Sequence, residues 1–108
     1  MKTTTTTPLR VALAATLTLT LAGLARAADA PDIWKTKCAA CHAPDGKGKP
    51  TLKTKDYTSA DVQAKMTDDE IVKAITDGVT GTRMSAYKDK LTPDEIKSLT
   101  AYIRTLKK

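Results

Sequence analysis

The chain of 108 residues has few aromatic side chains, and few histidines and cysteines. It contains no phenylalanine, one tryptophan and three tyrosines, and its only histidine and both cysteines fall within five consecutive positions. So few large aromatic side chains predict a thin apolar core, which a bound group with an apolar surface of its own would complete. The apolar residues never alternate with a period of two, so we predict no strands.

The first 27 residues have the pattern of a secretory signal. Lys2 and Arg10 flank a threonine-rich head, residues 11–24 carry no charge, and Ala25-Arg26-Ala27 offers small residues at a cleavage site. We expect cleavage after Ala27, a mature domain over residues 28–108, and export through the general secretory route to the periplasm. The apolar run is shorter than the roughly 20 residues of a membrane-spanning helix. We therefore expect no stable membrane insertion after cleavage, with an uncleaved anchor as the alternative.

Positive charge is modest in amount but uneven in distribution. Loss of the three basic residues of the signal would lower the net charge from +6 to +3. That balance, without aromatic residues among the basic ones, does not favour nucleic-acid binding. Lysines crowd around the two cysteines and an acidic stretch follows, which is either a solvated surface or a basic rim that steers an acidic partner. The lysines are Lys35, Lys37, Lys47, Lys49, Lys53 and Lys55, and the acidic residues are Asp61, Asp68, Asp69, Glu70 and Asp77.

Three helices are predicted by periodicity and capping signals. The first spans about residues 32–41, the second opens at Thr67 and closes at Gly78, and the third opens at Thr92. The second and third each begin with a capping box, in which a threonine and the glutamate three residues later satisfy free backbone donors. A shorter helical turn is expected after Ser59. Two long connections, over residues 43–60 and 78–91, are too long to be simple turns.

Three chemistries compete for the segment Cys38-Ala39-Ala40-Cys41-His42. Cysteines at this spacing can form a redox disulfide, but that motif usually joins a strand to a helix, and no strand is predicted here. A closed zinc site needs four ligands, and no further cysteine or histidine exists to complete one. The third interpretation uses all three residues, because both thiols can add to the vinyl groups of haem and the imidazole can then bind iron. We favour covalent haem.

Over nearly the whole mature chain, the sequence resembles the small monohaem class I c-type cytochromes of bacterial periplasms. The resemblance includes Trp34, the haem motif, the glycine-rich residues 46–50, the segment over residues 81–87, and the last helix. It implies an all-α cytochrome c fold, in which three to four short helices wrap around one haem c attached through Cys38 and Cys41.

Met84 is the sixth iron ligand that this resemblance implies, opposite His42. The other methionine of the predicted mature chain, Met66, already has a structural role as a hydrophobic staple to Ile71. Ser85 stands where the family commonly has proline, which would leave the loop less rigid and the iron–sulfur bond easier to displace.

Further positions follow from the resemblance alone. The backbone carbonyl of Pro50 is expected to accept a hydrogen bond from the other ring nitrogen of His42, which would orient the imidazole. Leu52 is expected to pack on the haem. Trp34 and Tyr102 are expected to form an aromatic contact between the first and last helices.

The function that these features imply is a soluble periplasmic one-electron carrier, such as those of respiratory chains, and not an enzyme. It would act as a monomer between redox proteins with acidic docking surfaces. Two alternatives stay open: a ligand sensor or peroxidase-like enzyme whose distal methionine is displaceable, and a membrane-anchored haem subunit of a larger oxidoreductase.

Overall fold

The computed structural model describes residues 29–108, in which every regular element is helical. The predicted signal over residues 1–27 lies outside this part of the chain. The elements in order are α1 (Ala30–Ile33), η1 (Trp34–Cys38), α2 (Ala39–His42), η2 (Pro50–Leu52), α3 (Ala60–Lys65), α4 (Asp68–Asp77) and α5 (Pro93–Thr105). The all-α prediction is therefore confirmed for the described residues.

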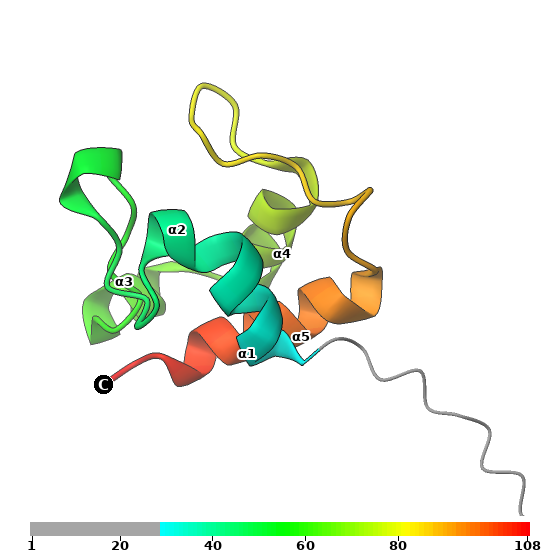
Figure 1. Ribbon diagram of the computed structural model, residues 1–108. Helices are drawn as coiled ribbons and strands as arrows, with labels where there is room; N and C mark the ends of the chain where they lie inside the picture. Colours follow the sequence, from blue (N-terminus) through cyan, green and yellow to red (C-terminus); the bar gives the residue numbers. More distant parts are fainter. Residues whose placement is uncertain (1–28) are drawn as a thin grey trace, which may run out of the picture.

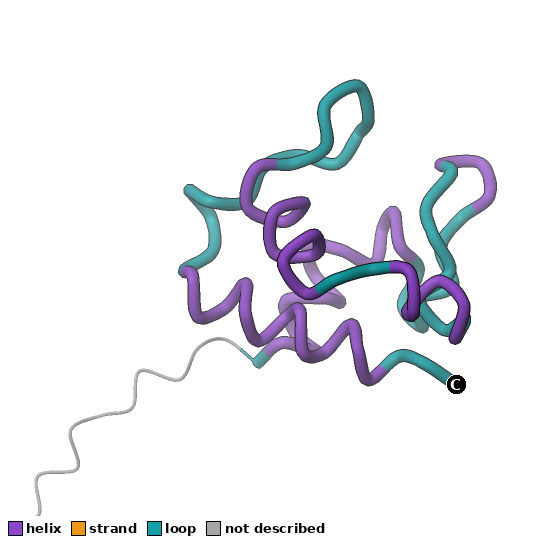
Figure 2. Tube along the Cα trace, turned by 180° about the vertical axis from the view of Figure 1, so that it is seen from behind, coloured by secondary structure: helices purple, strands orange, loops and turns teal. Residues whose placement is uncertain are grey.

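The helices pack around the long C-terminal helix. Helix α5 contacts both α1 and α4, and the two long loops project from the opposite side of the molecule (Figure 1). Figure 2 shows the same arrangement from behind, with α5 at one side of the molecule and the loops at the other. The arrangement leaves the two loops free to flank α2, which ends between them (Figure 1).

The core is small and mostly aliphatic. Nine buried apolar side chains form one cluster, and the α5 side chain of Leu99 is completely buried within it. Leu99 and its neighbours on α5 recur at helical spacing, which is why one face of α5 is buried and the other is polar. The nine residues are Ile33, Trp34, Ala39, Ile71, Ile75, Leu91, Ile96, Leu99 and Ile103.

The predicted helix starts are confirmed in detail. Thr67 and Thr92 each accept a hydrogen bond from the backbone three residues on, and Glu70 and Glu95 complete both capping boxes. The shorter turn after Ser59 is helix α3, which the Ser59 hydroxyl caps through Val62. These signals were predictable because every group involved lies within four residues of the helix start.

The first helix differs from the prediction in length and in geometry. One helical run extends from Ala30 to His42, and its middle turn, η1, is a π-helix in which the Ala39 N–H donates to the Trp34 carbonyl. A π turn adds one residue to the helical turn and rotates the next residues around the helix axis. It therefore changes the direction in which the side chains of Cys38 and Cys41 point from the helix axis.

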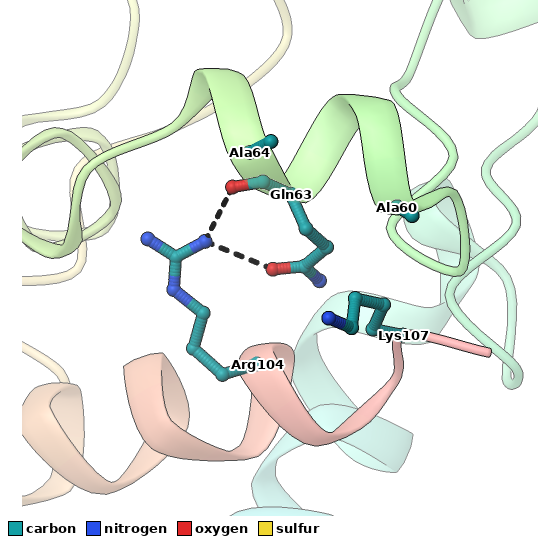
Figure 3. Close-up of a pocket in the computed structure, with 5 residues that line it drawn as sticks. All are labelled: Ala60, Gln63, Ala64, Arg104 and Lys107. Atoms are coloured by element: carbon teal, nitrogen blue, oxygen red, sulfur yellow. Dashed lines mark hydrogen bonds between the residues drawn. The ribbon is translucent and has the colours of Figure 1, made fainter.

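A guanidinium joins the C-terminal helix to α3. Arg104 donates from Nη1 to both the backbone and the side-chain oxygens of Gln63, at 2.8 and 2.9 Å (Figure 3). Its Nη2 donates to the Met66 carbonyl at 2.6 Å. Arg104 also pairs with Asp68 at 2.7 Å. The last carbonyl groups of a helix have few donors within it, and Arg104 supplies donors to two of them at the end of α3. A cavity of about 380 Å³ lies beside this group, bounded also by Ala60, Ala64 and Lys107 (Figure 3).

Candidate haem-binding site

The two cysteines and the histidine all lie on the helical run that the π turn interrupts. Cys38 is the last residue of η1, and Cys41 and His42 belong to α2. Both cysteines are partly buried free thiols. The run stops at Ala43, whose φ of 65° turns the chain sharply away after His42. The side chain of Trp34 fixes the end of this run, because it donates its indole N–H to the Ala43 and Pro44 carbonyls.

The thiol of Cys38 is poorly suited to dithiol chemistry. Burial raises its pKa to about 11, and the neighbouring positive charge of Lys37 offsets this only in part. A dithiol catalyst needs the opposite shift, because the thiolate is the reactive form. A metal site formed by the protein alone is not supported either, since no three His, Cys, Asp or Glu side chains converge within residues 29–108. The environment of Cys38 is that of a sulfur that does not ionise.

The imidazole of His42 is enclosed by aromatic rings. Its centroid lies 5.7 Å from that of Trp34, and it stacks on Tyr57 at 5.5 Å with an interplanar angle of 25°. Burial lowers the pKa of His42, so the ring is held neutral, which is the form that binds a metal. Its Nδ1 atom is buried and has no hydrogen-bond partner in the described part of the chain. A buried polar atom without a partner is costly, and this atom is therefore the main sign that the site is built for an additional group.

The predicted hydrogen bond between Pro50 and His42 is not formed in this structure. The Pro50 carbonyl instead accepts from the Lys53 N–H at 3.1 Å, where it closes the short helix η2. Pro50 is exposed, while Leu52 is partly buried and is not among the side chains packed on the core. The carbonyl is used locally because η2 is a single turn and this bond is the one that ends it.

The loop after His42 is held to α2 by polar contacts that sequence reasoning missed. Thr54 accepts from the Lys49 N–H at 2.6 Å and donates to the Cys41 carbonyl at 2.9 Å. Gly48 has a φ of 74°, and a Cβ there would lie 2.6 Å from the Thr54 carbonyl oxygen. The glycine-rich motif therefore lets the two sides of this loop approach closely while Thr54 ties it to the cysteine-bearing helix.

Met84 lies on the second long loop and packs against the core cluster, as Cys38 does. Its N–H donates to the Thr82 hydroxyl at 3.1 Å, and its carbonyl accepts from Val79 at 3.0 Å. The expected aromatic contact is confirmed: the Trp34 and Tyr102 rings lie 5.9 Å apart, between the first and last helices. Tyr57 and Tyr87 were not predicted as site residues, because neither has a local sequence signal that links it to the cysteine motif.

Comparison with known proteins gives the site its context. The cytochrome c family model matches residues 27–107. The chain belongs to the cytochrome c family. Proteins of this family hold haem covalently and transfer electrons through it, and the Cys38, Cys41 and His42 spacing is the one that attaches haem c.

Solved structures and a curated relative agree with this assignment. The c-type cytochrome KustC0563 is 32% identical, with a TM-score of 0.69, and the match covers 74% of this chain and 99% of that one. Cytochrome c6C from Synechococcus sp. PCC 7002 has the same fold, with a TM-score of 0.56 and 24% identity over 71% of this chain and 92% of its own. The cbb3-type cytochrome c oxidase subunit FixP of Azorhizobium caulinodans is 37% identical over 75 residues, or 69% of this chain. The chain spans about a quarter of that subunit's length.

The residues present fit a haem c. Two free thiols lie on one helical run, and the imidazole next to them is neutral with an unpartnered buried nitrogen. The partly buried thioether of Met84 packs against the core cluster from the second long loop. A thioether bond would also remove the Cys38 thiol, which burial disfavours as a thiolate. The predicted cytochrome c fold is confirmed, whereas the assignment of individual residues to the haem stays a prediction.

Proposed function

We propose that this protein is a soluble periplasmic carrier of single electrons, with one haem c attached through Cys38 and Cys41 and ligated by His42 and Met84. The observation that carries the proposal is the partly buried His42 imidazole, neutral and with a buried, unpartnered Nδ1 atom, beside two free thiols. When bound, the haem supplies an iron that accepts and releases one electron. The protein supplies everything else: ligands, burial and a docking surface.

Each ligand in this proposal has a defined electronic role. His42 would bind as a neutral imidazole because burial disfavours its protonation. Met84 would offer a neutral, soft thioether, a ligand that raises the potential of a cytochrome relative to bis-imidazole ligation. Neither group gains or loses a proton in the physiological pH range, so electron transfer needs no proton transfer. If His42 and Met84 both bind the iron, no position on it would remain open to a substrate, and we propose that the protein is not an enzyme.

The first test is the absorption spectrum of the protein matured in a bacterial periplasm. We expect a c-type haem spectrum with the weak far-red band of sulfur ligation in the ferric form, and no immediate shift when carbon monoxide is added to the ferrous form, because binding must wait until Met84 leaves the iron. Immediate binding of carbon monoxide would favour the sensor or peroxidase-like alternative. Absence of haem would contradict the proposal entirely.

The variant Met84→Ala tests the sixth ligand. It should lose the far-red band, bind carbon monoxide readily and have a lower midpoint potential, because the thioether no longer stabilises the ferrous form. The matched variant Met66→Ala removes the other methionine of residues 29–108, which lies between α3 and α4 and packs on the core. It should keep the band. A band that survives in Met84→Ala would show that Met84 is not the ligand.

The partners that we propose are redox proteins with acidic docking surfaces, which this protein meets as a monomer. The predicted basic rim lies on η1 and on the loop over residues 43–59, although Lys49 also donates to the Ala40 carbonyl at 2.6 Å. If the rim steers docking, electron transfer to an acidic partner should slow as salt rises to about 0.15 M and above. Lys37→Glu and Lys53→Glu should slow it further, whereas Lys97→Glu on α5 should have little effect. Equal responses of all three variants would contradict the docking surface.

A second candidate is a haem subunit of a larger oxidoreductase, which the resemblance to an oxidase subunit favours. Within residues 29–108, no helix is long and apolar enough to cross a membrane. The decisive segment for this alternative is the predicted signal. Mass spectrometry of the mature amino terminus distinguishes a protein that begins near residue 28 from one that keeps the apolar run as an anchor.

A further inference from the structure

Tyr87 is the residue at which the Met84 loop is fastened to the rest of the molecule. Its N–H donates to the Ile75 carbonyl near the end of α4 at 2.9 Å. Its own carbonyl accepts from the N–H groups of Lys90 and Leu91, both at 2.9 Å. The backbone of Tyr87 thus joins the end of α4 to the turn that precedes α5.

The side chain of Tyr87 makes a different connection. Its hydroxyl donates to the Lys37 carbonyl at 3.1 Å, across 50 positions of sequence. Lys37 directly precedes Cys38 on η1, so this bond joins the Met84 loop to the helical run that carries both cysteines. Burial raises the pKa of Tyr87, so the hydroxyl remains protonated and able to donate at neutral pH.

Within residues 29–108, the other hydrogen bonds of this loop do not join it to the cysteine-bearing helix. Val79 donates to the Met84 carbonyl, which closes the loop on itself. A Cβ on Gly78 would lie 2.7 Å from the same carbonyl, so the returning chain packs closely on the end of α4. Ser85 is exposed and leaves the backbone after Met84 without the fixed φ of a proline. Within residues 29–108, the Tyr87 hydroxyl is the one hydrogen bond from this loop to η1 or α2.

We propose that the Tyr87–Lys37 hydrogen bond is a positioning device that holds the Met84 loop against the cysteine-bearing helix and so keeps Met84 on the iron. Tyr87 acts through Met84 and touches no reacting atom itself. The inference rests on the proposed role of Met84 as a ligand. The Tyr87 hydroxyl restrains the loop on the C-terminal side of Met84. It therefore supplies part of the rigidity that a proline at position 85 would give the loop.

The test compares three variants of the haem-loaded protein. Tyr87→Phe removes the hydroxyl and keeps the ring. Tyr102→Phe is the matched control, since its ring contacts Trp34 while the structure gives its hydroxyl no partner within residues 29–108. Met84→Ala reports on the ligand itself. For each protein we would measure the rate of carbon monoxide binding to the ferrous form by stopped flow, and the far-red band of the ferric form.

Carbon monoxide can bind only when Met84 has left the iron, so its rate reports loop opening. Loss of one exposed hydrogen bond should make Tyr87→Phe bind about two- to fivefold faster than the wild type, with the far-red band retained. Tyr102→Phe should bind at the wild-type rate. A wild-type rate in Tyr87→Phe, or an equal acceleration in Tyr102→Phe, would overturn the inference while a lost band in Met84→Ala still supports the proposed ligand. A Met84→Ala protein that keeps both the band and the slow rate would overturn the ligand assignment, and the inference with it.

Discussion

Replacing Arg104 by alanine should destabilise the haem-loaded protein by about 2–3 kcal/mol. The guanidinium serves three acceptors at the end of α3: the Gln63 carbonyl, the Gln63 side-chain oxygen and the Met66 carbonyl. Gln63 is only 6% exposed, and its amide nitrogen is itself bonded to the Tyr57 and Ile103 carbonyls, so its side chain has no freedom to find another donor.

The expected magnitude follows from burial and from access of water. A hydrogen bond from a charged donor contributes about 1.5–3 kcal/mol, and three such bonds would suggest a larger sum. The cavity beside Arg104 is about 380 Å³ in volume, however, so water can reach the acceptors that the variant frees. The fourth partner, Asp68, has a side chain that is 69% exposed, and a surface pair of this kind contributes about 0–1 kcal/mol.

Two further variants separate geometry from charge. Arg104→Lys keeps the positive charge, but one ammonium cannot match the planar fork that reaches Gln63 and Met66 together, so it should be destabilised by about 1–2 kcal/mol. Asp68→Asn should lose less than about 1 kcal/mol. The assay is urea unfolding followed by far-ultraviolet circular dichroism. An Arg104→Ala loss below about 1 kcal/mol, or full stability of Arg104→Lys, would refute the reasoning.

Gly48 and Gly81 both have φ near 75°, but a Cβ at Gly48 would lie 2.6–2.7 Å from the Thr54 and Lys55 carbonyl oxygens, whereas one at Gly81 meets nothing within 4 Å. Gly81→Ala should therefore lose about 1 kcal/mol and Gly48→Ala at least about 2 kcal/mol, and equal melting temperatures would contradict this difference. In the haem-free Cys41→Ser protein, alkylation of Cys38 at pH 8 should be about 100-fold slower than in the urea-unfolded chain, because a pKa of about 11 in place of 9.0 leaves so little thiolate. Similar rates in both states would show that Cys38 is not buried as described.

The sequence alone determined the features of this protein that are local. The capping boxes at Thr67 and Thr92, and the cap at Ser59, depend on groups within four residues of each other, so they formed as predicted. The segment from Cys38 to His42 indicated haem attachment for the same reason, because the signal is the spacing of the two cysteines and the histidine along the chain. The bond expected of Pro50 came from resemblance and not from the residues around it, and here the closure of η2 occupies that carbonyl.

Only the tertiary structure decided the surroundings of those residues. The π turn that ends at Cys38 has no distinguishing sequence pattern, since the same residues are compatible with an ordinary helix. Tyr57 reaches His42 from the far end of a loop, and Tyr87 reaches Lys37 across 50 positions. The physical reason is that such contacts depend on how helices pack, and packing responds to the shapes of side chains that lie far apart in the sequence.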